Sequence, residues 1–465
     1  MDFAKRAYDH SFGFDPIIRN LGDVDFYKLT MAQLIWRNHR DQRVSLKVTN
    51  RTKTVRLNDE IDLTELRRQL DHVKTLKWEN NFLVWLAGNT FYGQEGIFSR
   101  EYLEYLRKDF KLGDYDLKLS FDRVPHLLAG VGSRPDDYMA RQLNGQIELT
   151  FTGTWIETTM WEIYALTIVN ELRYRTKMRE MPKWRLDIMY ANAKVKLFRK
   201  LQRLKHLKNL NLTDFGTRRR HSFLWQEYCV LMAKEVLGDK FTGTSNAYLA
   251  FKHGLEAKGS MAHELTMAVA AMAVSDDDLK AAQYRVLEEW QREYSGNMLV
   301  CLPDTFGTTQ FLRDAPEWLK NWTGFRPDSK EPFEGGEELI RYWTEKSVDP
   351  SDKLILFSDG LDVRIDGYTV NGADIVDIYN HFDGRTRVGF GFGTNLTNDF
   401  RGCDPLDPTN MNPISLVCKV HEVEGRPAIK LSDSYTKATS GAPDELARYR
   451  RVFGSEGMSD IPTLV

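Results

Sequence analysis

The sequence contains no apolar run that approaches the roughly 18 residues a transmembrane helix requires. No apolar segment follows Met1 to Arg6, so we expect no secretory signal peptide. Cysteine is scarce, and Cys229, Cys301, Cys403 and Cys418 lie far apart, without the spacing of metal ligands. We therefore expect a cytoplasmic protein that does not bind membranes, with buried thiols at Cys229, Cys301 and Cys418.

An excess of charge of one sign is also missing. The 64 lysines and arginines nearly balance 66 aspartates and glutamates, for a formal net charge of −2. We therefore expect no nucleic-acid partner, and any anion site must be local. The segment 194–208 is rich in Lys and Arg, but its leucines recur at helical spacing. This pattern predicts a helix with a buried apolar stripe and a solvated basic face.

One pattern recurs from about residue 210 onward: a short apolar segment, a polar turn cluster and a helical stretch. Strands that alternate with helices predict a parallel sheet, and a long series of such units suggests closure into an α/β barrel. The chemistry of such a barrel gathers at the carboxyl ends of its strands. The seven polar clusters that end the candidate strands are 214–217, 241–245, 259–263, 298–304, 324–329, 353–360 and 388–394.

Residues 43–125 form a different, α+β block. Helical periodicity predicts helices at 63–76 and 100–110. Alternation of apolar and polar residues predicts half-buried strands at 44–49 and 116–121, and we predict that strands at 414–422 and 427–431 return to this block.

His263 follows a turn, Gly259 to Ala262, and precedes an apolar stretch, 265–274, that is predicted to be helical. The start of a helix offers free backbone N–H groups and the positive end of the helix dipole, which together favour anions. A histidine there either binds an anion, carries a phosphoryl group on a ring nitrogen, or is an ordinary polar turn residue.

An arginine cluster follows the turn at Gly216. Arg218, Arg219 and Arg220 are consecutive, and the guanidinium fork matches phosphate or carboxylate oxygens. The cluster is either an anion cradle or a solvated basic turn. Phe215, just before it, offers an aromatic face to a flat ring or belongs to the core.

Two further strand ends are rich in glycine. Ser358, Asp359 and Gly360 end one apolar segment, and Gly391 to Thr394, with glycines at Gly391 and Gly393, ends another. Glycine lets backbone N–H groups converge on a phosphate without obstruction. Neither is a P-loop, because no Gly-Lys-Ser/Thr follows. Together they suggest sites for two phosphate groups.

Carboxylates stand at several of these strand ends. Asp304 and Asp359 are candidate oxygen ligands for Mg²⁺, or they cap the helices that follow. Arg326 and Asp328 either contact the substrate or form a structural ion pair.

Taken together, these motifs resemble the nicotinate phosphoribosyltransferase family, in the family's order and over most of the chain. The matching stretches are Asp25–Lys28, Asp214–Arg220, Gly243–Asn246, Gly259–Glu264, Arg326–Ser329, Phe357–Asp359, Gly391–Thr394 and Lys430–Ser434. The chain departs from the family at Lys330-Glu331, where many relatives have Gly-Asp, and at Tyr435-Thr436, which replaces Pro-Gly. The second departure leaves Lys437 a less certain phosphate contact.

The resemblance implies an α/β fold, an irregular parallel barrel over residues 151–404 that carries the active site. It implies an α+β domain formed by the two chain ends, residues 1–150 and 405–465. The implied reaction joins nicotinate and phosphoribosyl pyrophosphate into nicotinate mononucleotide and pyrophosphate, coupled to ATP hydrolysis, with Mg²⁺. His263 matches the family's transiently phosphorylated histidine. A homodimer is implied, with Tyr27 near the neighbouring subunit's site.

The resemblance also assigns roles. Tyr27 and Phe215 would sandwich the pyridine ring, and Arg218 or Arg326 would hold its carboxylate. Ser245 stands where the related nicotinamide enzyme has an aspartate, which would repel a carboxylate, so serine favours the acid. The residues implied to bind the phosphates and ribose are Arg219, Asp328, Ser358, Asp359, Gly360, Gly391, Gly393 and Thr394, with Asp304 and Asp359 as metal ligands.

Two alternatives remain open. A sister enzyme would use nicotinamide or quinolinate, although Ser245 and the intact arginine motif argue against both. A non-enzymatic nucleotide- or RNA-binding protein would use the arginine cluster and the basic helix, although the near-neutral charge and the polar strand ends argue against it.

Overall fold

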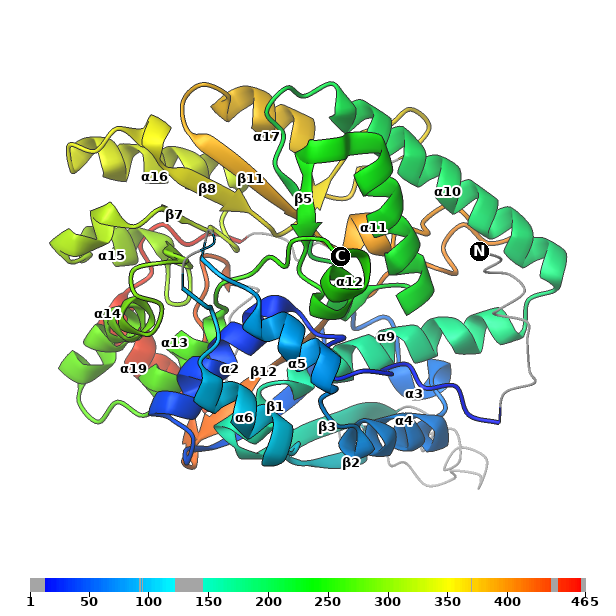
Figure 1. Ribbon diagram of the computed structural model, residues 1–465, viewed down its shortest axis with the longest axis horizontal. Coiled ribbons are helices and arrows are strands. Elements are labelled where there is room, and N and C mark those ends of the chain that lie inside the picture. The colour runs from blue at the N-terminus through cyan, green and yellow to red at the C-terminus, as the bar shows by residue number, and fades with distance from the viewer. Residues whose placement is uncertain are drawn as a thin grey trace, which may run out of the picture.

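The computed structural model describes residues 13–460 except 92, 94, 122–144, 369 and 436–441. An antiparallel sheet and a parallel sheet organise the chain (Figure 1). The antiparallel sheet contains, in pairing order, β13 (Arg426–Pro427), β12 (Leu416–Val423), β1 (Arg43–Asn50), β3 (Gly145–Thr154) and β2 (Asp114–Phe121). Strands from both ends of the chain thus share one sheet, as predicted.

Strand β1 shows why this sheet forms. Its residues alternate between exposed and buried from Val44 to Asn50, which is the pattern of a strand with one face on the core. It pairs with β12 on one side, where Val48 lies opposite Cys418, and with β3 on the other. The strand predicted at 427–431 is wrong in extent, because only the two residues of β13 pair there.

The parallel sheet contains β5 (Phe241–Thr244), β4 (Leu212–Asp214), β11 (Arg387–Phe392), β8 (Leu354–Phe357), β7 (Gly324–Phe325) and β6 (Val300–Cys301) in that order. A small parallel pair, β9 (Leu361–Asp362) and β10 (Ala373–Asp374), follows β8. Six of the seven predicted strand ends therefore lie in one sheet. Among the described residues this sheet is open, since its edge strands β5 and β6 do not pair with each other.

The predicted strand at 259–263 is wrong. Gly259 has a φ of +152° and packs so closely on α2 that a Cβ there would lie 2.7 Å from the backbone nitrogen of Tyr27. The preceding segment makes a single bridge, between Ala257 and Thr244. The glycine at this position therefore serves a close backbone approach rather than a turn after a strand.

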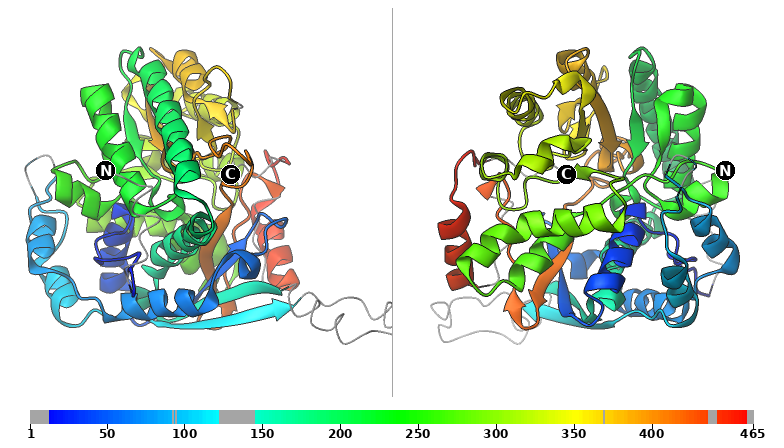
Figure 2. Two further views of the ribbon diagram at one scale, coloured as in Figure 1. Left: turned by 90° about the vertical axis from the view of Figure 1, so that its right-hand side faces the viewer. Right: turned by 60° about the vertical axis from the view of Figure 1, so that its left-hand side comes forward.

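Helices cover both sheets. The first group is α2 (Phe26–Asn38), α3 (Leu57–Glu60), α4 (Leu63–Thr75), α5 (Asn80–Ala87), α6 (Arg100–Lys108), α8 (Trp155–Thr158), α9 (Trp161–Arg179) and α10 (Lys183–Lys205). The second group is α11 (Phe223–Leu237), α12 (Ala247–His253), α13 (His263–Ala271), α14 (Asp276–Glu293), α15 (Thr308–Arg313), α16 (Pro332–Glu345), α17 (Ile375–Phe382), α18 (Thr394–Thr397) and α19 (Pro443–Phe453). In Figure 2 the antiparallel sheet lies low in the molecule and the parallel sheet lies above it.

Helix α10 corrects one prediction. Its leucines at 197, 201 and 204 are buried as expected, but the basic face is not wholly solvated. Lys196 and Lys200 are buried and form ion pairs with Asp399, and Lys200 also pairs with Asp362. Buried charges require such partners, so these lysines tie α10 to β9 and to the segment after α18.

None of the described helices is both long enough and apolar enough to cross a bilayer. All four cysteines are buried as free thiols, which confirms the prediction for Cys229, Cys301 and Cys418 and adds Cys403.

Candidate active site

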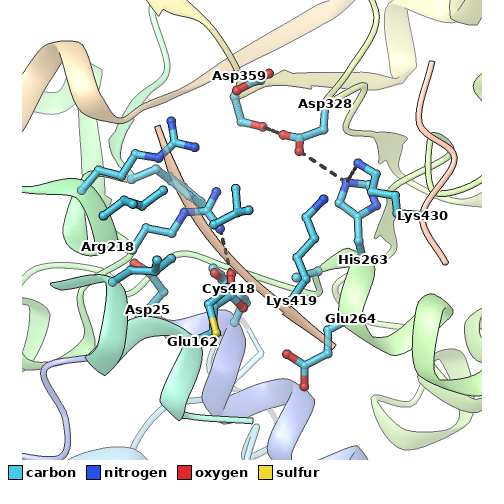
Figure 3. Close-up of a pocket in the computed structure, with 18 of the residues that line it drawn as sticks. Asp25, Glu162, Arg218, His263, Glu264, Asp328, Asp359, Cys418, Lys419 and Lys430 are labelled. Atoms are coloured by element: carbon cyan, nitrogen blue, oxygen red, sulfur yellow. Dashed lines mark hydrogen bonds and ion pairs between the residues drawn. The ribbon is translucent and has the colours of Figure 1, made fainter. Parts of the chain in front are cut away.

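The candidate site is a pocket between the two sheets (Figure 3). Residues after β4, β7 and β8 line it from the carboxyl ends of the parallel strands, and β12, α2 and α13 close it from the other side. The residues that line it are Asp25, Tyr27, Arg51, Glu162, Leu166, Phe215, Arg218, Arg219, Ala262, His263, Glu264, Met267, Arg326, Asp328, Ser329, Ser358, Asp359, Leu416, Val417, Cys418, Lys419, Val420 and Lys430. Carboxyl ends of parallel strands therefore supply the site, as the sequence predicted.

His263 is the first residue of α13, and its two ring nitrogens face different surroundings. Nδ1 lies 3.0 Å from the hydroxyl of Thr305, behind the pocket wall. Nε2 lies 3.1 Å from Lys430 Nζ and 3.3 Å from Asp328 Oδ2, two residues that line the pocket. When Nε2 carries a proton it donates to Asp328; when only Nδ1 is protonated and donates to Thr305, Nε2 keeps its lone pair and accepts from Lys430.

The surroundings of His263 favour this neutral form. Burial lowers the pKa of His263 below its ordinary value, attraction by Asp304 opposes that effect, and repulsion by the Lys430 ammonium adds to it. A neutral imidazole in contact with the pocket is a nucleophile or a hydrogen-bond partner, and not a fixed cation.

Asp304 and Asp328 flank His263. Asp304 is fully buried and accepts from Ser329 Oγ at 2.6 Å, and Lys430 Nζ lies 3.3 Å from it. Asp328 accepts from Ser358 Oγ at 2.8 Å. Burial alone would raise the pKa of Asp328, but its hydrogen bond with His263 and the charge of Arg326 hold that pKa well below the ordinary value.

The site offers both oxygen and nitrogen ligands to a divalent cation. Ligand atoms of His263, Asp304 and Asp328 lie within 4.8 Å of one another. The Lys430 ammonium already lies against the first two, so an ion among all three would have to displace it. Mg²⁺ prefers oxygen ligands and substrate phosphates, and the carboxylates of Asp328 and Asp359 line the pocket and fit that preference.

A row of charges, buried except for the partly exposed Arg218, supports the other end of the pocket. Arg218 Nη1 donates to Glu162 at 3.0 Å, Glu162 pairs with Lys28 at 2.6 Å, and Lys28 pairs with Glu264. Glu264 also accepts from Trp155 Nε1 at 2.7 Å. Burial would raise the pKa of Glu162, but Lys28 and Arg218 lower it below the ordinary value, so the carboxylate stays charged. The row holds Arg218 in place at the pocket wall.

Two other cations in the pocket, Arg219 and Lys419, differ from Arg218. Within the described part of the chain, no carboxylate lies within ion-pairing distance of either of them, whereas Arg218 pairs with Glu162 and Lys430 with Asp304. Burial lowers the pKa of Arg219 to about 10, and the neighbouring charge of Arg218 contributes. Burial also lowers the pKa of Lys419, and Lys430 and Arg51 add repulsion. Cations that repel one another in a pocket are relieved by an anionic ligand.

A second hollow adjoins the first and shares Phe215, Arg218, Arg219, Ser358 and Asp359 with it. Its remaining wall comes from two chain segments that follow β8 and β11. These residues are Gly360, Leu361, Asn371, Gly393, Thr394 and Asn395. Gly391 lies behind this wall, where an added Cβ would sit 3.1 Å from the Phe215 ring. The predicted phosphate residues are thus brought together in this hollow, apart from Asp328, which lines the first pocket, and Gly391, which makes room for Phe215.

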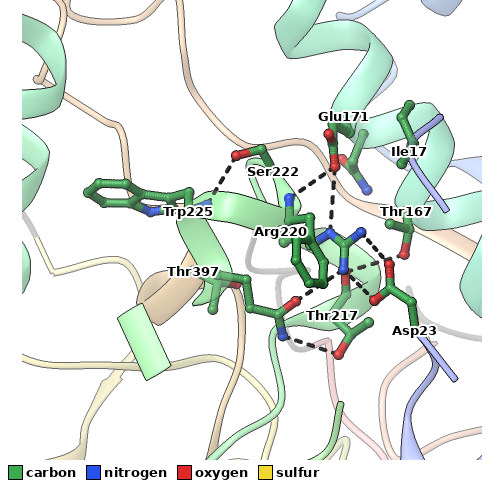
Figure 4. Close-up of polar contacts among 12 residues, drawn as sticks. Ile17, Asp23, Thr167, Glu171, Thr217, Arg220, Ser222, Trp225 and Thr397 are labelled. Atoms are coloured by element: carbon green, nitrogen blue, oxygen red, sulfur yellow. Dashed lines mark hydrogen bonds and ion pairs between the residues drawn. The ribbon is translucent and has the colours of Figure 1, made fainter. Parts of the chain in front are cut away.

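Arg220 is not part of the predicted anion cradle. It is fully buried and forms two hydrogen bonds with Asp23, at 2.6 and 2.7 Å, while Glu171 lies 3.6 Å from its Nε (Figure 4). Asp23 also accepts from Asn246. The third arginine of the cluster is therefore structural: it follows the 3-10 turn Thr217–Arg219 with an extended backbone, and its side chain lies in the interior on Asp23 and not in the pocket.

Ser245 differs from expectation. It does not line the pocket but donates to Asp25 Oδ1 at 2.6 Å, and Asp25 lines it. Tyr27 is only 4% exposed and lines the pocket of its own chain, and its place near a neighbouring subunit's site stays a prediction.

The first of the two departures from the family pattern has a local explanation. Lys330 donates to Thr309 at 3.0 Å and pairs with Glu338, while the side chain of Glu331 caps α16. Tyr435 is exposed, and Thr436 and Lys437 lie outside the described residues.

Sequence reasoning missed several pocket residues, among them Arg51, Glu162, Glu264, Lys419 and Lys430 as charged groups. A signal existed for two of them. Lys419 interrupts the otherwise apolar strand Leu416–Val420, and Glu162 lies within an apolar stretch of α9. A charge inside a buried element requires a partner or a function.

The fold and the pocket together define an enzyme that binds small anionic substrates, one of which carries an aromatic ring. The model of the nicotinate phosphoribosyltransferase (NAPRTase) family matches residues 210–457, and that of the family's N-terminal domain matches residues 23–170. The chain belongs to the nicotinate phosphoribosyltransferase family.

Two solved structures of nicotinate phosphoribosyltransferases support this family assignment. The crystal structure of nicotinate phosphoribosyltransferase from Vibrio cholerae is 27% identical, with a TM-score of 0.76, and the match covers 97% of this chain and 96% of that one. The enzyme from Porphyromonas gingivalis is 25% identical, with a TM-score of 0.73, and the match covers 94% and 100%.

Proposed function

We propose that this protein transfers the 5-phosphoribosyl group of phosphoribosyl pyrophosphate to the ring nitrogen of nicotinate, and that ATP hydrolysis drives the transfer through phosphorylation of His263. The products are nicotinate mononucleotide and pyrophosphate, with ADP and phosphate from ATP, so the enzyme is a ligase by class. One observation supports the transfer best: a pocket lined by aromatic side chains and arginines opens beside a hollow lined by glycines and by Arg219, which has no carboxylate partner among the described residues.

Nicotinate fits the part of the pocket lined by Tyr27 and Phe215. A flat ring between two aromatic side chains gains stacking and apolar contact. Its carboxylate needs a guanidinium, and Arg218 and Arg326 both line this pocket. Arg326 Nε is a buried donor without an acceptor in the described chain, whereas Arg218 already binds Glu162. We therefore assign the carboxylate to Arg326.

The phosphoribosyl donor fits the rest of the site. Its 5-phosphate would lie in the second hollow, against Gly393, Thr394 and Arg219. Its pyrophosphate would lie near the cations Arg51 and Lys419. Positive charge there stabilises the leaving group as C1 of the ribose becomes an oxocarbenium ion, and the ring nitrogen is held in line with the breaking bond.

Magnesium suits this site. Asp328 and Asp359 would hold it together with phosphate oxygens of the substrate, and Asp304 would remain behind His263, bound to Ser329 and Lys430. When bound, the ion neutralises charge on the pyrophosphate.

ATP coupling would use Nε2 of His263. Its lone pair attacks the γ-phosphorus of ATP, an N–P bond forms, the P–O bond to ADP breaks, and ADP leaves. Water later hydrolyses the N–P bond and releases phosphate. Lys430, beside Nε2, compensates the charge of the phosphoryl group. The phosphohistidine would add negative charge beside the cations of the site and so order them for catalysis.

One comparison tests these assignments. The protein is supplied with phosphoribosyl pyrophosphate, Mg²⁺ and nicotinate, nicotinamide or quinolinate, each with and without ATP, and the mononucleotide is measured. We expect turnover of nicotinate that ATP stimulates. His263→Ala should lose the stimulation and keep some ATP-independent activity. Turnover of nicotinamide or quinolinate alone would refute the substrate, and unchanged stimulation in the variant would refute the role of His263.

A further inference from the structure

Lys419 is a lysine in the wall of the candidate site. It lies on β12, and its partly exposed side chain points into the pocket (Figure 3). Within the residues that the structure describes, its ammonium group makes no ion pair and no hydrogen bond. The strand around it, Leu416–Val420, is otherwise apolar, and the residue opposite it on β1 is a second lysine, Lys47. The adjacent positions of its own sheet therefore supply no counter-ion.

The buried lysines of the described chain differ from Lys419, because each of them has an acceptor within 3.3 Å. The acceptors are Glu162 for Lys28, Asp399 for Lys196 and Lys200, the backbone oxygen of Trp322 for Lys353, and Asp304 for Lys430. A charge inside a protein requires such partners. Lys419 has none of these contacts, so its charged form is less well stabilised than theirs.

The charges that face Lys419 favour its neutral amine. Burial lowers the pKa of Lys419 well below its ordinary value, and repulsion by Lys430 and Arg51 adds to that effect. Asp328 and Glu162 attract the ammonium group but do not restore the ordinary pKa. The neutral amine of a lysine that lies beside other cations is a nucleophile toward carbonyl carbon.

We propose that Lys419 is a covalent modification site for small aldehydes that carry a phosphate group. Nζ attacks the aldehyde carbon and a C–N bond forms. The carbonyl oxygen then leaves as water with the two hydrogens of the amine, which gives an imine. Water reverses the reaction. This modification requires neither nicotinate nor ATP, so it is independent of the transfer reaction proposed above.

The phosphate of such an aldehyde fits the guanidinium groups of the site. Arg51 and Arg219 line the same pocket as Lys419, and Arg219 Nε is a buried donor without an acceptor in the described chain. Guanidinium groups stay charged and bind phosphate oxygens in pairs, whereas the amine of Lys419 is free to react. The bound adduct would occupy the space assigned to the pyrophosphate of the phosphoribosyl donor and would therefore inhibit the enzyme.

Reductive trapping locates the modification. The full-length protein, without substrates, is incubated with pyridoxal 5′-phosphate at neutral pH and treated with borohydride, which adds hydride to the imine carbon and makes the bond permanent. Peptide mass spectrometry then identifies the labelled lysine. Each unit by which the pKa is lowered raises the neutral fraction about tenfold, so we expect Lys419 to be labelled at least about tenfold faster than an exposed lysine. Lys111, whose side chain is 75% exposed, is the reference. Labelling of Lys419 no faster than that of Lys111 would overturn the proposal.

Two arginine variants test the nucleophile within the same pocket. Lys419→Arg keeps the positive charge and removes the amine, so labelling of the pocket should disappear. Lys430→Arg is the matched control, because Lys430 also lines the pocket but is paired with Asp304. It should leave the labelling of Lys419 intact. Labelling of the pocket that persists in Lys419→Arg and disappears in Lys430→Arg would assign the reaction to Lys430 and refute the proposal.

Pyridoxal tests the role of the phosphate, since it has the same ring and aldehyde without the anion. At equal concentration we expect it to label Lys419 about tenfold more slowly, the effect of one lost charge-assisted contact. Arg219→Gln should slow labelling by pyridoxal 5′-phosphate and leave labelling by pyridoxal unchanged. Equal rates with the two aldehydes in the wild-type protein would overturn the assigned class of ligand.

Discussion

Lys430 Nζ lies 3.1 Å from Nε2 of His263, the ring nitrogen that faces the pocket. An ammonium in this position disfavours protonation of the imidazole and would also attract a phosphoryl group bound to it. The same lysine lies 3.3 Å from the buried carboxylate of Asp304, which keeps it in place. The contact thus suits both the free and the phosphorylated state of the histidine.

Replacing this lysine should shift the pH dependence of the ATP-stimulated activity. Repulsion by Lys430 lowers the pKa of His263, so in Lys430→Met that pKa rises. Because the neutral imidazole is the active form, the acidic limb of the ATP-stimulated rate should move to higher pH. Lys430→Arg keeps the charge and should move the limb little. A limb that stays in place in Lys430→Met would contradict this account.

The hydroxyl of Thr305 should control which ring nitrogen of His263 carries the proton. Thr305→Val removes the partner of Nδ1 while it keeps the shape of the side chain. We expect the ATP-stimulated rate to fall by about tenfold, the cost of one lost orienting hydrogen bond, with less effect on the rate without ATP. Thr305→Ser should retain the stimulation. Equal loss of both rates in Thr305→Val would indicate only a structural role.

Glu162 should act on nicotinate binding through Arg218, which lines the pocket with Tyr27 and Phe215 although the carboxylate itself is assigned to Arg326. Glu162→Gln removes the charge that holds the Arg218 guanidinium against this wall, and we expect the KM for nicotinate to rise by about tenfold. Glu264→Gln is the matched control, because Glu264 pairs with Lys28 and not with Arg218. It should lower the melting temperature to a similar degree and change the KM less. The same rise in KM in both variants would argue against a role of Arg218 in shaping the nicotinate site.

Lys200 should hold in place the wall of the second hollow, where the 5-phosphate is proposed to lie. Its ammonium donates to the backbone oxygen of Asn395 at 3.0 Å and to Asp362, which follows Leu361 in the wall. We expect Lys200→Met to raise the KM for phosphoribosyl pyrophosphate more than that for nicotinate.

Lys196→Met supplies the control for that measurement. Lys196 also pairs with Asp399, but it donates to no residue that lines the hollow. Each variant breaks a buried pair, which costs about 3–5 kcal/mol of stability, so both should unfold at lower temperature. If both raise the same KM equally, the effect of Lys200 is a loss of stability alone.

Much of the fold was predictable because it depends on contiguous residues. The alternation at 44–49, the apolar runs before Asp214 and Ser358, and the helix that begins at His263 are local patterns, and each is confirmed. Predictions failed where a distant part of the chain decided the outcome. The sequence around Gly259 is typical of a turn after a strand, but glycine is required at this position because the backbone of α2 packs against it.

The residues of the candidate site likewise fall into those that local sequence predicted and those that only the folded chain brings together. Residue types and their order along the chain determined which strand ends carry polar chemistry, and they determined the family. Only the tertiary structure decided that Arg219 faces the pocket while Arg220 is buried on Asp23, and that Lys430 meets His263 across 167 positions. Ion pairs between distant residues leave no periodic trace in a sequence, because their energy depends on distance and burial in the folded chain.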